Sequence, residues 1–157
     1  MSTTSRSIRR ARYADAAEIY RLARLFTPGL GLAAADFDEN FQSLIKDPNW
    51  FICVAGSSYG LTGYAAAQDY GRGLRTTFTV GRMHDLFVEP AGRRTGIGKE
   101  LVEEVFHWAR RRPFPMILDW QATPESIAFY ESFGMEADFI GDFPECPGFS
   151  LDLRPIQ

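Results

Sequence analysis

The chain has 157 residues, 45% of them hydrophobic, and a formal net charge of −3 at pH 7. This length suits a single domain over residues 1–157 with a sizeable core of its own. The negative charge gives no overall basic surface for nucleic acid, and no apolar run is long enough to span a membrane, so neither partner is expected.

The first part of the chain predicts one strand and two helices. Ile8 to Tyr13 predict a short strand, and Asp15 can cap the helix that follows. Pro28-Gly29 ends that helix, and a second one is expected from about Ala33 to Lys46, with acidic residues near its N-terminal turn. The apolar residues of the first helix recur at helical spacing, at Ile19, Leu22, Ala23 and Phe26.

The middle of the chain predicts a hairpin, a long strand and a third helix. Strands are expected at Trp50–Ala55 and Leu61–Gln68, because a glycine- and serine-rich turn separates two apolar runs. A longer strand follows at about Thr76–Val88, and residues 98–112 predict a helix.

The last part of the chain predicts further alternation of strands and helices. The expected elements are a strand at Met116–Trp120, a helix at Pro124–Phe133, and strands at Ala137–Ile140 and Phe149–Leu153. The order β-α-α-β-β-β-α-β-α-β-β indicates a mixed α/β (α+β) chain, without internal repeats or linkers.

The segment before the helix at 98–112 is the most informative part of the sequence. Val88-Glu89-Pro90 ends a strand, and Arg93-Arg94-Thr95-Gly96-Ile97-Gly98-Lys99 opens directly into the helix. Such a loop directs backbone N–H groups and the positive end of the helix dipole toward one point. It predicts a site for a phosphate or pyrophosphate group, the alternative being a turn that only caps the helix.

Spacing excludes two well-known phosphate loops. A Walker loop needs a glycine five positions before Gly98-Lys99, where Arg93 stands, and Ser or Thr after the lysine, where Glu100 stands. A dinucleotide fingerprint needs a third glycine at position 101, which is Leu101, within an early βαβ unit.

Two motifs carry a resemblance to the GCN5-related N-acetyltransferase (GNAT) family. Arg93-x-x-Gly96-x-Gly98, in its strand-loop-helix setting, resembles the acetyl-CoA motif R/Q-x-x-G-x-G/A. Residues 123–135 look like the later motif N-x-x-A-x-x-F-Y-x-x-x-G-F, with Thr123, Ser126 and Met135 as departures. The resemblance covers nearly the whole chain and implies a central, mostly antiparallel sheet of six to seven strands flanked by about four helices.

The resemblance implies acetyl-CoA as co-substrate, with no metal. Main-chain groups of Leu86, Phe87 and Val88 would pair with the pantetheine like an added strand, and a backbone N–H in that region would contact the thioester oxygen. Arg93 or Arg94 would add a charged contact to the pyrophosphate. Backbone N–H groups would hold the pyrophosphate at Arg94, Thr95, Gly96, Ile97, Gly98 and Lys99. The cofactor arm would meet Thr123, Ser126 and Phe129.

The resemblance also places Tyr130 at the position of the family's general acid. A phenol with a pKa of about 10 is protonated at neutral pH and can donate a proton to a leaving thiolate. The alternative is a core aromatic residue beside Phe129 and Phe133, which helical patterning alone does not exclude.

His84 and Asp85 are candidates for proton removal from the acceptor. An alkylammonium has a pKa of about 10.4 and must lose a proton before it attacks. His84 matches the place where some family members carry a glutamate, and histidine is a suitable base near neutral pH. A strand histidine without a catalytic role is the alternative.

The acceptor is defined only as a primary amine on a small molecule or a peptide. Leu118-Asp119-Trp120 and the segment up to Tyr130 are similar to the diamine acetyltransferases, although two extra residues separate the tryptophan from the tyrosine. A cationic amine would fit a pocket lined by acidic and aromatic residues. Candidates are Asp36, Asp38, Glu39, Asp69, Asp85, Asp119, Phe37, Tyr70 and Trp120, although solvated surface charges are the alternative for each carboxylate.

Three functional classes follow from the sequence. The first is an N-acetyltransferase, the second a non-catalytic acyl-CoA-binding regulatory module on the same fold, and the third a scaffold protein. A tyrosine at position 130 favours the enzyme. Exchange of late strands would support a homodimer. With only Cys53 and Cys146, no disulfide framework is expected, and a cytoplasmic location is the default.

Overall fold

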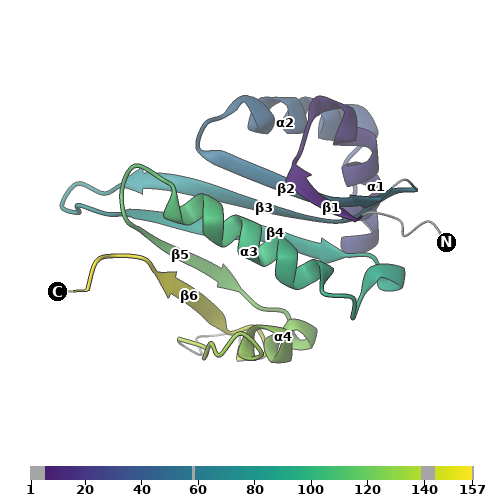
Figure 1. Ribbon diagram of the computed structural model, residues 1–157. Helices are drawn as coiled ribbons and strands as arrows, with labels where there is room; N and C mark the ends of the chain where they lie inside the picture. The colour runs from purple at the N-terminus through teal and green to yellow at the C-terminus, as the bar shows by residue number, and fades with distance from the viewer. Residues whose placement is uncertain (1–5, 58, 139–143, 157) are drawn as a thin grey trace. The chain divides into compact units, whose positions relative to one another are not determined.

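The computed structural model describes residues 6–57, 59–138 and 144–156. In these residues four α-helices flank a six-stranded sheet with the strand order β1-β2-β3-β4-β5-β6 (Figure 1). The chain divides into two compact units, the first made of Met1–Gln68 and His84–Trp108, the second of Asp69–Met83 and Ala109–Gln157. β3 and β4 each contribute residues to both units.

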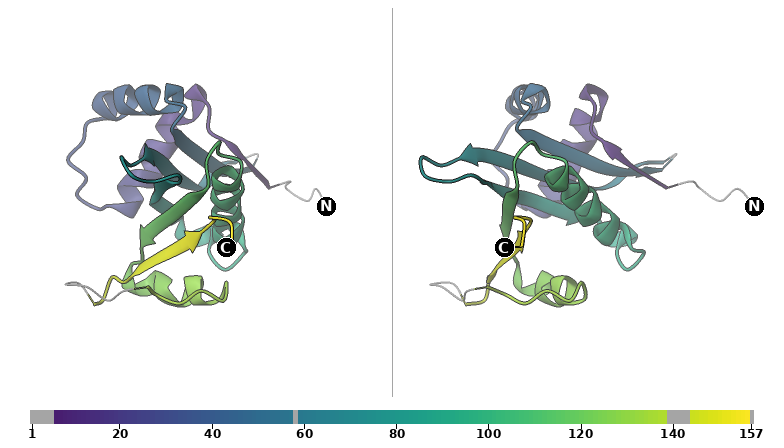
Figure 2. Two further views of the ribbon diagram at one scale, coloured as in Figure 1. Left: turned by 90° about the vertical axis from the view of Figure 1, so that its left-hand side faces the viewer. Right: turned by 60° about the vertical axis from the view of Figure 1, so that its left-hand side comes forward.

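The first unit is a sheet with helices on both faces. β1 pairs with β2, and β2 with β3, in antiparallel register. Figures 1 and 2 show α1 and α2 on one side of these strands and α3 on the other. The elements are β1 (Ser7–Arg10), α1 (Ala16–Phe26), α2 (Ala34–Lys46), β2 (Trp50–Ser57), β3 (Gly60–Arg72), β4 (Thr79–Val88) and α3 (Ile97–Arg110).

Alternation along β2 explains how one strand serves two cores. Ile52 and Val54 belong to the apolar cluster that α1 and α2 complete, whereas Phe51 stacks on Trp108 of α3 with ring centroids 5.5 Å apart. Successive side chains of a strand point to opposite faces, so both faces of β2 are buried. This is why the strand reads as an unbroken apolar run.

The second unit is built around β5 (Met116–Gln121) and β6 (Gly148–Asp152), with the short helix α4 (Ile127–Glu131). β5 pairs in parallel with residues Thr79 to Arg82 of β4 and antiparallel with β6. Trp120 is buried and packs against the rings of Tyr130 and Phe149, with centroid distances of 5.4 and 6.2 Å. Aromatic packing therefore forms the core of this unit.

The expected fold class is confirmed, and several boundaries are corrected. Ala137 and Asp138 are not in a strand, while the rest of the expected strand at 137–140 lies outside the described residues. The helix expected at 124–133 begins as a 3₁₀ turn at Pro124–Ser126 and its α-helical part ends at Glu131. The strand expected at Ile8–Tyr13 ends at Arg10, and a 3₁₀ turn begins at Tyr13.

Asp15 precedes α1 as predicted, but its carboxylate does not cap that helix. It accepts a hydrogen bond from the backbone N–H of Arg12 at 2.7 Å and forms an ion pair with Arg9 at 2.7 Å. The guanidinium of Arg9 holds the pKa of Asp15 below its usual range. The carboxylate thus fixes the turn between β1 and α1.

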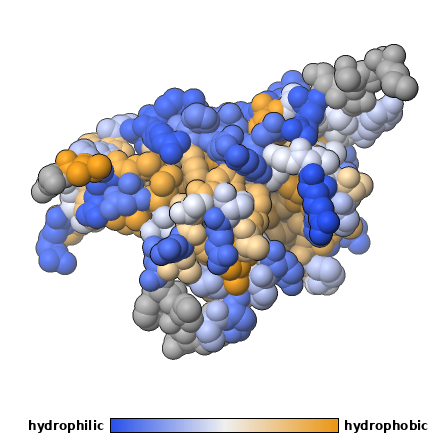
Figure 3. Space-filling view, turned by 60° about the horizontal axis from the view of Figure 1, so that its bottom comes forward, coloured by the Kyte–Doolittle hydropathy of each residue, from blue (hydrophilic) through white to orange (hydrophobic). Residues whose placement is uncertain are grey.

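The surface carries scattered apolar side chains. Figure 3 shows them between hydrophilic residues on one face. The most exposed large ones are Leu74, Ile156 and Tyr59, which are far apart in sequence, and single exposed apolar residues are normal in folded proteins. Within the described part of the chain, no helix combines the length and apolar character that crossing a membrane requires.

Candidate functional site

The loop between β4 and α3 has two residues in the left-handed region. After the 3₁₀ turn Pro90–Gly92, the chain passes Arg94 at φ 63° and Gly96 at φ 84°, and α3 begins at Ile97. A Cβ at Gly96 would meet no atom within 4 Å. The glycine is therefore needed for its backbone conformation and not for space.

The loop presents a run of backbone donors that have no acceptor among the described residues. The N–H groups from Arg94 through Gly98 donate no hydrogen bond to any described residue, and the first bond of the helix runs from Glu100 N to Gly96 O at 3.1 Å. The first four N–H groups of any α-helix lack partners within the helix, and the helix dipole adds partial positive charge there. This donor set fits a phosphate or pyrophosphate group.

The two arginines of the loop have different roles. Arg93 Nε donates to the carbonyl of Val88 at 2.9 Å, and its guanidinium lies 5.7 Å from the ring centroid of Phe87. Arg94 is exposed, and no carboxylate of the described residues pairs with it. Arg93 therefore fastens the loop to the end of β4, while Arg94 is the better placed to meet an anion.

Arg6 also holds this loop, and sequence analysis missed it. Its Nη1 donates to the carbonyl of Thr95 at 2.9 Å, and its Nη2 lies 2.9 Å from a carboxylate oxygen of Glu100. The ion pair offsets a negative charge in the first turn of α3. No local pattern could have indicated a contact between residues so distant in sequence.

The end of β4 is held closely against β3. A Cβ on Gly63 would lie 2.8 Å from the carbonyl oxygen of Phe87, and Glu89 N donates to Thr62 O at 2.8 Å. The ring of Phe87 is buried and meets Phe26 of α1 edge-on at 5.3 Å. The parallel ladder of β4 with β5 covers Thr79 to Arg82, so the main-chain groups of Leu86, Phe87 and Val88 lie outside it.

His84 and Asp85 lie together on one face of the first unit. His84 Nε2 is 3.1 Å from Gln68 Oε1, and its ring stacks on Trp50 at 5.0 Å. The carboxylate of Asp85 accepts a hydrogen bond from Tyr64 at 3.1 Å.

These contacts show a break in the alternation of β4. Tyr64 and Gln68 are an even number of residues apart on β3 and share a face, yet adjacent residues of β4 contact both of them. Adjacent strand residues normally point to opposite faces, so β4 is irregular at His84-Asp85, as at a β-bulge. The irregularity lies just before Leu86 to Val88.

Burial shapes the chemistry of Asp85. It raises the pKa of this carboxyl above its ordinary value, although the Tyr64 hydroxyl and the charge of His84 act in the opposite direction. Burial and the neighbouring carboxylate also raise the pKa of Tyr64. Asp85 is therefore a carboxylate held beside a histidine in a poorly solvated place, an arrangement common at sites of proton transfer.

Tyr130 belongs to the second unit. Its ring packs on Trp120, Phe149 and Phe129, and burial raises the pKa of its phenol. The hydroxyl makes no hydrogen bond with a described residue. Both expectations, a core ring and a protonated donor, fit this position.

The other residues expected near the cofactor arm occupy the turn before α4. Thr123 N donates to Ser126 Oγ at 2.9 Å, and the two hydroxyl oxygens are 3.0 Å apart. The two side chains thus close the 3₁₀ turn on each other. Phe129 packs edge-on against Tyr130 and Phe133.

The acidic residues expected near the acceptor belong to both units. Asp69 is buried and accepts from Arg112 at 2.9 Å, and Asp119 pairs with Arg82 at 3.0 Å. Asp36, Asp38 and Glu39 lie on α2, where Asp38 accepts from Gln42. In the described residues, no group of three or more His, Cys, Asp or Glu side chains could hold a metal ion.

Several solved structures are similar to this chain in fold. Glucosamine-6-phosphate N-acetyltransferase from Arabidopsis thaliana superposes with a TM-score of 0.76 at 20% identity, over 87% of this chain and 95% of that chain. NAA60 of Arabidopsis thaliana in complex with acetyl-CoA gives a TM-score of 0.73 at 15% identity, over 95% of this chain and 99% of that chain. An aminoglycoside acetyltransferase from an uncultured soil metagenomic sample, in complex with sisomicin, gives a TM-score of 0.70 at 20% identity, over 88% of this chain and 94% of that chain. At these identities the likeness concerns the fold.

Comparison of the sequence with known families identifies the family of this chain. No curated protein matches it. Residues 16–135 match the family model described as "Acetyltransferase (GNAT) family". This range runs from the start of α1 past α4 and contains the loop, the His84-Asp85 irregularity and Tyr130. The chain belongs to the acetyltransferase (GNAT) family.

Proposed function

We propose that this chain is an acetyl-CoA-dependent N-acetyltransferase that moves an acetyl group to a primary amine. The observation that carries the proposal is the run of N–H groups from Arg94 through Gly98, at and just before the start of α3, which donate to no described residue. We propose further that residues 1–157 act as one domain, and that the protein works in the cytoplasm, where its free Cys53 and Cys146 would stay reduced.

The loop and the end of β4 bind the co-substrate in this proposal. The N–H groups from Arg94 through Gly98 hold the pyrophosphate, and Arg94 adds a charged contact. Main-chain groups of Leu86 to Val88, outside the β4–β5 ladder, pair with the pantetheine as an added strand would. Bound acetyl-CoA supplies an activated acetyl thioester. A backbone N–H near the irregularity in β4 stabilises negative charge on the thioester oxygen during attack.

His84 prepares the acceptor. An ammonium group must lose a proton before its nitrogen can attack, and the imidazole of His84 accepts that proton. The Asp85 carboxylate beside it favours the imidazolium that results. Gln68 and the ring of Trp50 fix the orientation of the imidazole.

Tyr130 completes the transfer. The amine nitrogen forms a bond to the acetyl carbon, the carbon–sulfur bond breaks, and the sulfur leaves with the electron pair of that bond. The phenol of Tyr130 donates its proton to the sulfur, so free coenzyme A departs as a thiol, and the second proton lost by the attacking nitrogen returns the tyrosinate to a phenol. Burial keeps this phenol protonated across the physiological range.

A direct assay tests the proposed function. Purified protein is incubated with acetyl-CoA and a panel of primary amines, and the release of free thiol is followed over time. We expect release that depends on both the enzyme and one class of amine. Coenzyme A binding without thiol release across a broad panel would instead support a non-catalytic acyl-CoA-binding module. The panel includes diamines, because the segment from Leu118 to Tyr130 resembles the diamine acetyltransferases.

Replacing Asp85 with asparagine should have opposite effects on activity and stability. Without the carboxylate the imidazolium of His84 loses a favourable charge interaction, so kcat/KM should fall about tenfold. Because burial raises the pKa of Asp85, its contribution to stability is present in acid and is lost as pH rises through the raised pKa. The variant should therefore unfold at a higher temperature than wild type at neutral pH, and the difference should vanish near pH 3.

A double-mutant comparison isolates the role of Asp85. If Asp85 acts through the imidazole, Asp85→Asn should lower kcat/KM no further when His84 is already glutamine. The measurements are initial rates of thiol release and thermal unfolding of all four proteins from pH 3 to 9. An equal fall in kcat/KM in both backgrounds would show that Asp85 does not act through His84.

A further inference from the structure

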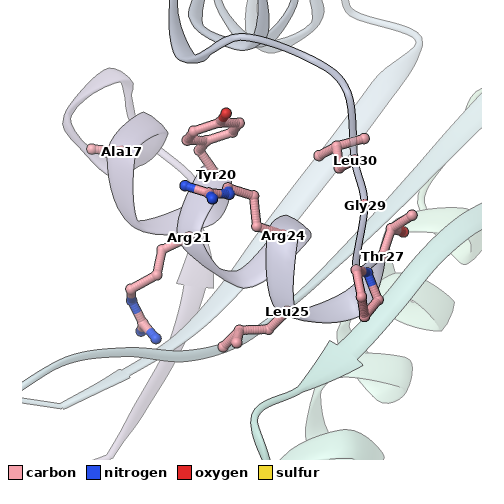
Figure 4. A pocket seen from close by; sticks show the side chains of 9 residues that line it. Ala17, Tyr20, Arg21, Arg24, Leu25, Thr27, Gly29 and Leu30 are labelled. Carbon is pink, nitrogen blue, oxygen red and sulfur yellow. The ribbon is translucent and has the colours of Figure 1, made fainter.

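A pocket of about 510 Å³ lies along α1 and the residues that follow it. Figure 4 shows the side chains of Tyr20 and Arg24 close together on one side of the helix, and Leu30 on the chain segment that follows it. Leu25 and Leu30 give the pocket apolar walls. The pocket therefore combines a cation, an aromatic ring and apolar surface, all within the first unit.

The two arginines that line the pocket differ in their partners. Arg21 is fully engaged: it pairs with Glu18 at 2.9 Å and Glu89 at 3.1 Å, and it donates to the carbonyl of Leu61 at 2.8 Å. Arg24 has no carboxylate partner among the described residues. Its position in the last turn of α1 complements the helix dipole, but that weak interaction leaves its hydrogen-bond donors unused.

Tyr20 orients the guanidinium of Arg24. The Tyr20 hydroxyl donates to the carbonyl of Leu32 at 2.7 Å, and its ring contacts that of Phe37 at 5.0 Å. The Arg24 guanidinium carbon lies 5.7 Å from the centroid of the Tyr20 ring. Because its hydroxyl and its ring are both held, Tyr20 is a fixed cation–π surface, and it limits the positions that the Arg24 side chain adopts.

The pocket is connected to the end of β4. Phe26, the last residue of α1, packs edge-on against Phe87, and Arg21 pairs with Glu89 just beyond the strand. These contacts tie the helix that carries Arg24 to the strand end that we assign to the thioester. Arg21 lines the pocket and also pairs with Glu89, so one lining residue contacts the residue just beyond that strand end.

We propose that this pocket binds an anionic group, a carboxylate or a phosphate monoester, at the non-reacting end of the acceptor amine. Arg24 binds this group with two parallel N–H donors, and the walls at Leu25 and Leu30 contact the apolar part of the molecule. The inference rests on the proposed N-acetyltransferase function and names the substrate class: amines that also carry a negative charge. A polyamine, which carries only positive charges, would be repelled by Arg24.

Matched acceptors test this proposal. Leucine is compared with leucinamide, glucosamine 6-phosphate with glucosamine, and spermidine serves as a purely cationic acceptor. We expect at least one anionic member to exceed its neutral partner in kcat/KM, and the pair that responds distinguishes carboxylate from phosphate. Arg24→Gln should lower kcat/KM for that anionic acceptor by about tenfold or more, and should leave the neutral acceptor within about twofold.

Arg10→Gln is the control, because it removes the same charge from the first unit at a residue that contacts Phe51 and does not line the pocket. It should leave the preference for the anionic acceptor intact. The proposal is overturned if Arg24→Gln lowers kcat/KM equally for charged and neutral acceptors, or if spermidine is the best acceptor.

A binding measurement separates this inference from the proposed function. Calorimetric titration with leucine and with glucosamine 6-phosphate is carried out on wild type and Arg24→Gln, with coenzyme A present. If no amine is acetylated but one of these ligands binds wild type at least tenfold more tightly than the variant, the pocket assignment stands and the enzymatic one fails. If neither titration differs between the two proteins, the pocket assignment fails even where acetylation is observed.

Discussion

Gly96→Val is expected to weaken coenzyme A binding about 100-fold or more. Gly96 has a φ of 84°, which a β-branched residue adopts only with strain, so valine should force the loop into another backbone conformation. The N–H groups from Arg94 through Gly98 would then no longer converge. Each hydrogen bond to a charged group contributes about 1.5–3 kcal/mol, and losing two of them corresponds to this loss of affinity. Calorimetric titration with coenzyme A measures it.

This variant should remain folded, with a moderate loss of stability. A Cβ at position 96 meets no atom within 4 Å, so the substitution creates no clash, and the strain should cost about 1–2 kcal/mol in urea unfolding. Gly71→Val is the matched control: Gly71 has a φ of 82° and equally open space, but lies in β3 far from the loop in sequence. It should unfold like Gly96→Val and bind coenzyme A like wild type. Unchanged affinity in Gly96→Val would remove the loop from the site.

The loop could be predicted from the sequence because its determinants are local. The proline after β4, the glycine at a left-handed position and the start of α3 all lie within a dozen residues. Backbone conformation and a helix start follow from nearest neighbours, so the donor set needs no tertiary information.

The residues that fix the loop and the acceptor side depend on distant contacts. Arg6 is 89 positions from Thr95, and Arg21 is 68 positions from Glu89. Neither pair forms a pattern along the chain, so sequence analysis found no role for either arginine. The pocket at Arg24 was missed for the same reason, since it arises where the segment after α1 folds back on the helix.

The candidate base was placed correctly on β4, but its surroundings were not foreseen. Strict alternation would direct His84 and Asp85 to opposite faces, whereas both contact side chains on one face of β3. An irregularity in a strand leaves little trace in a pattern of apolar and polar residues. At Asp15 a local pattern is present but the contact it predicts does not form. The residue type and position fit a helix cap, yet the carboxylate accepts a hydrogen bond from the backbone N–H of Arg12 and pairs with Arg9 instead.

Tyr130→Phe should reduce kcat about 100-fold or more while leaving the affinity for acetyl-CoA unchanged. A general acid typically contributes at least this factor, and phenylalanine keeps the ring that packs on Trp120 and Phe149. The hydroxyl makes no hydrogen bond with a described residue, so its removal leaves no partner unsatisfied, and the melting temperature should stay at or slightly above that of wild type. Steady-state rates, calorimetric titration and thermal unfolding measure the three quantities.

The pH profile gives an independent test of the acid role. Burial raises the pKa of Tyr130, so a phenol that acts as the acid stays protonated well into the alkaline range, and kcat of the wild type should not fall between pH 8 and about pH 10. Tyr13→Phe, a change of the same kind at an exposed residue of the first unit, should leave kcat unchanged. Full turnover by Tyr130→Phe would assign the proton on the leaving sulfur to water. The ring of Tyr130 would then serve only to pack against Trp120 and Phe149, because aromatic contacts alone account for its burial.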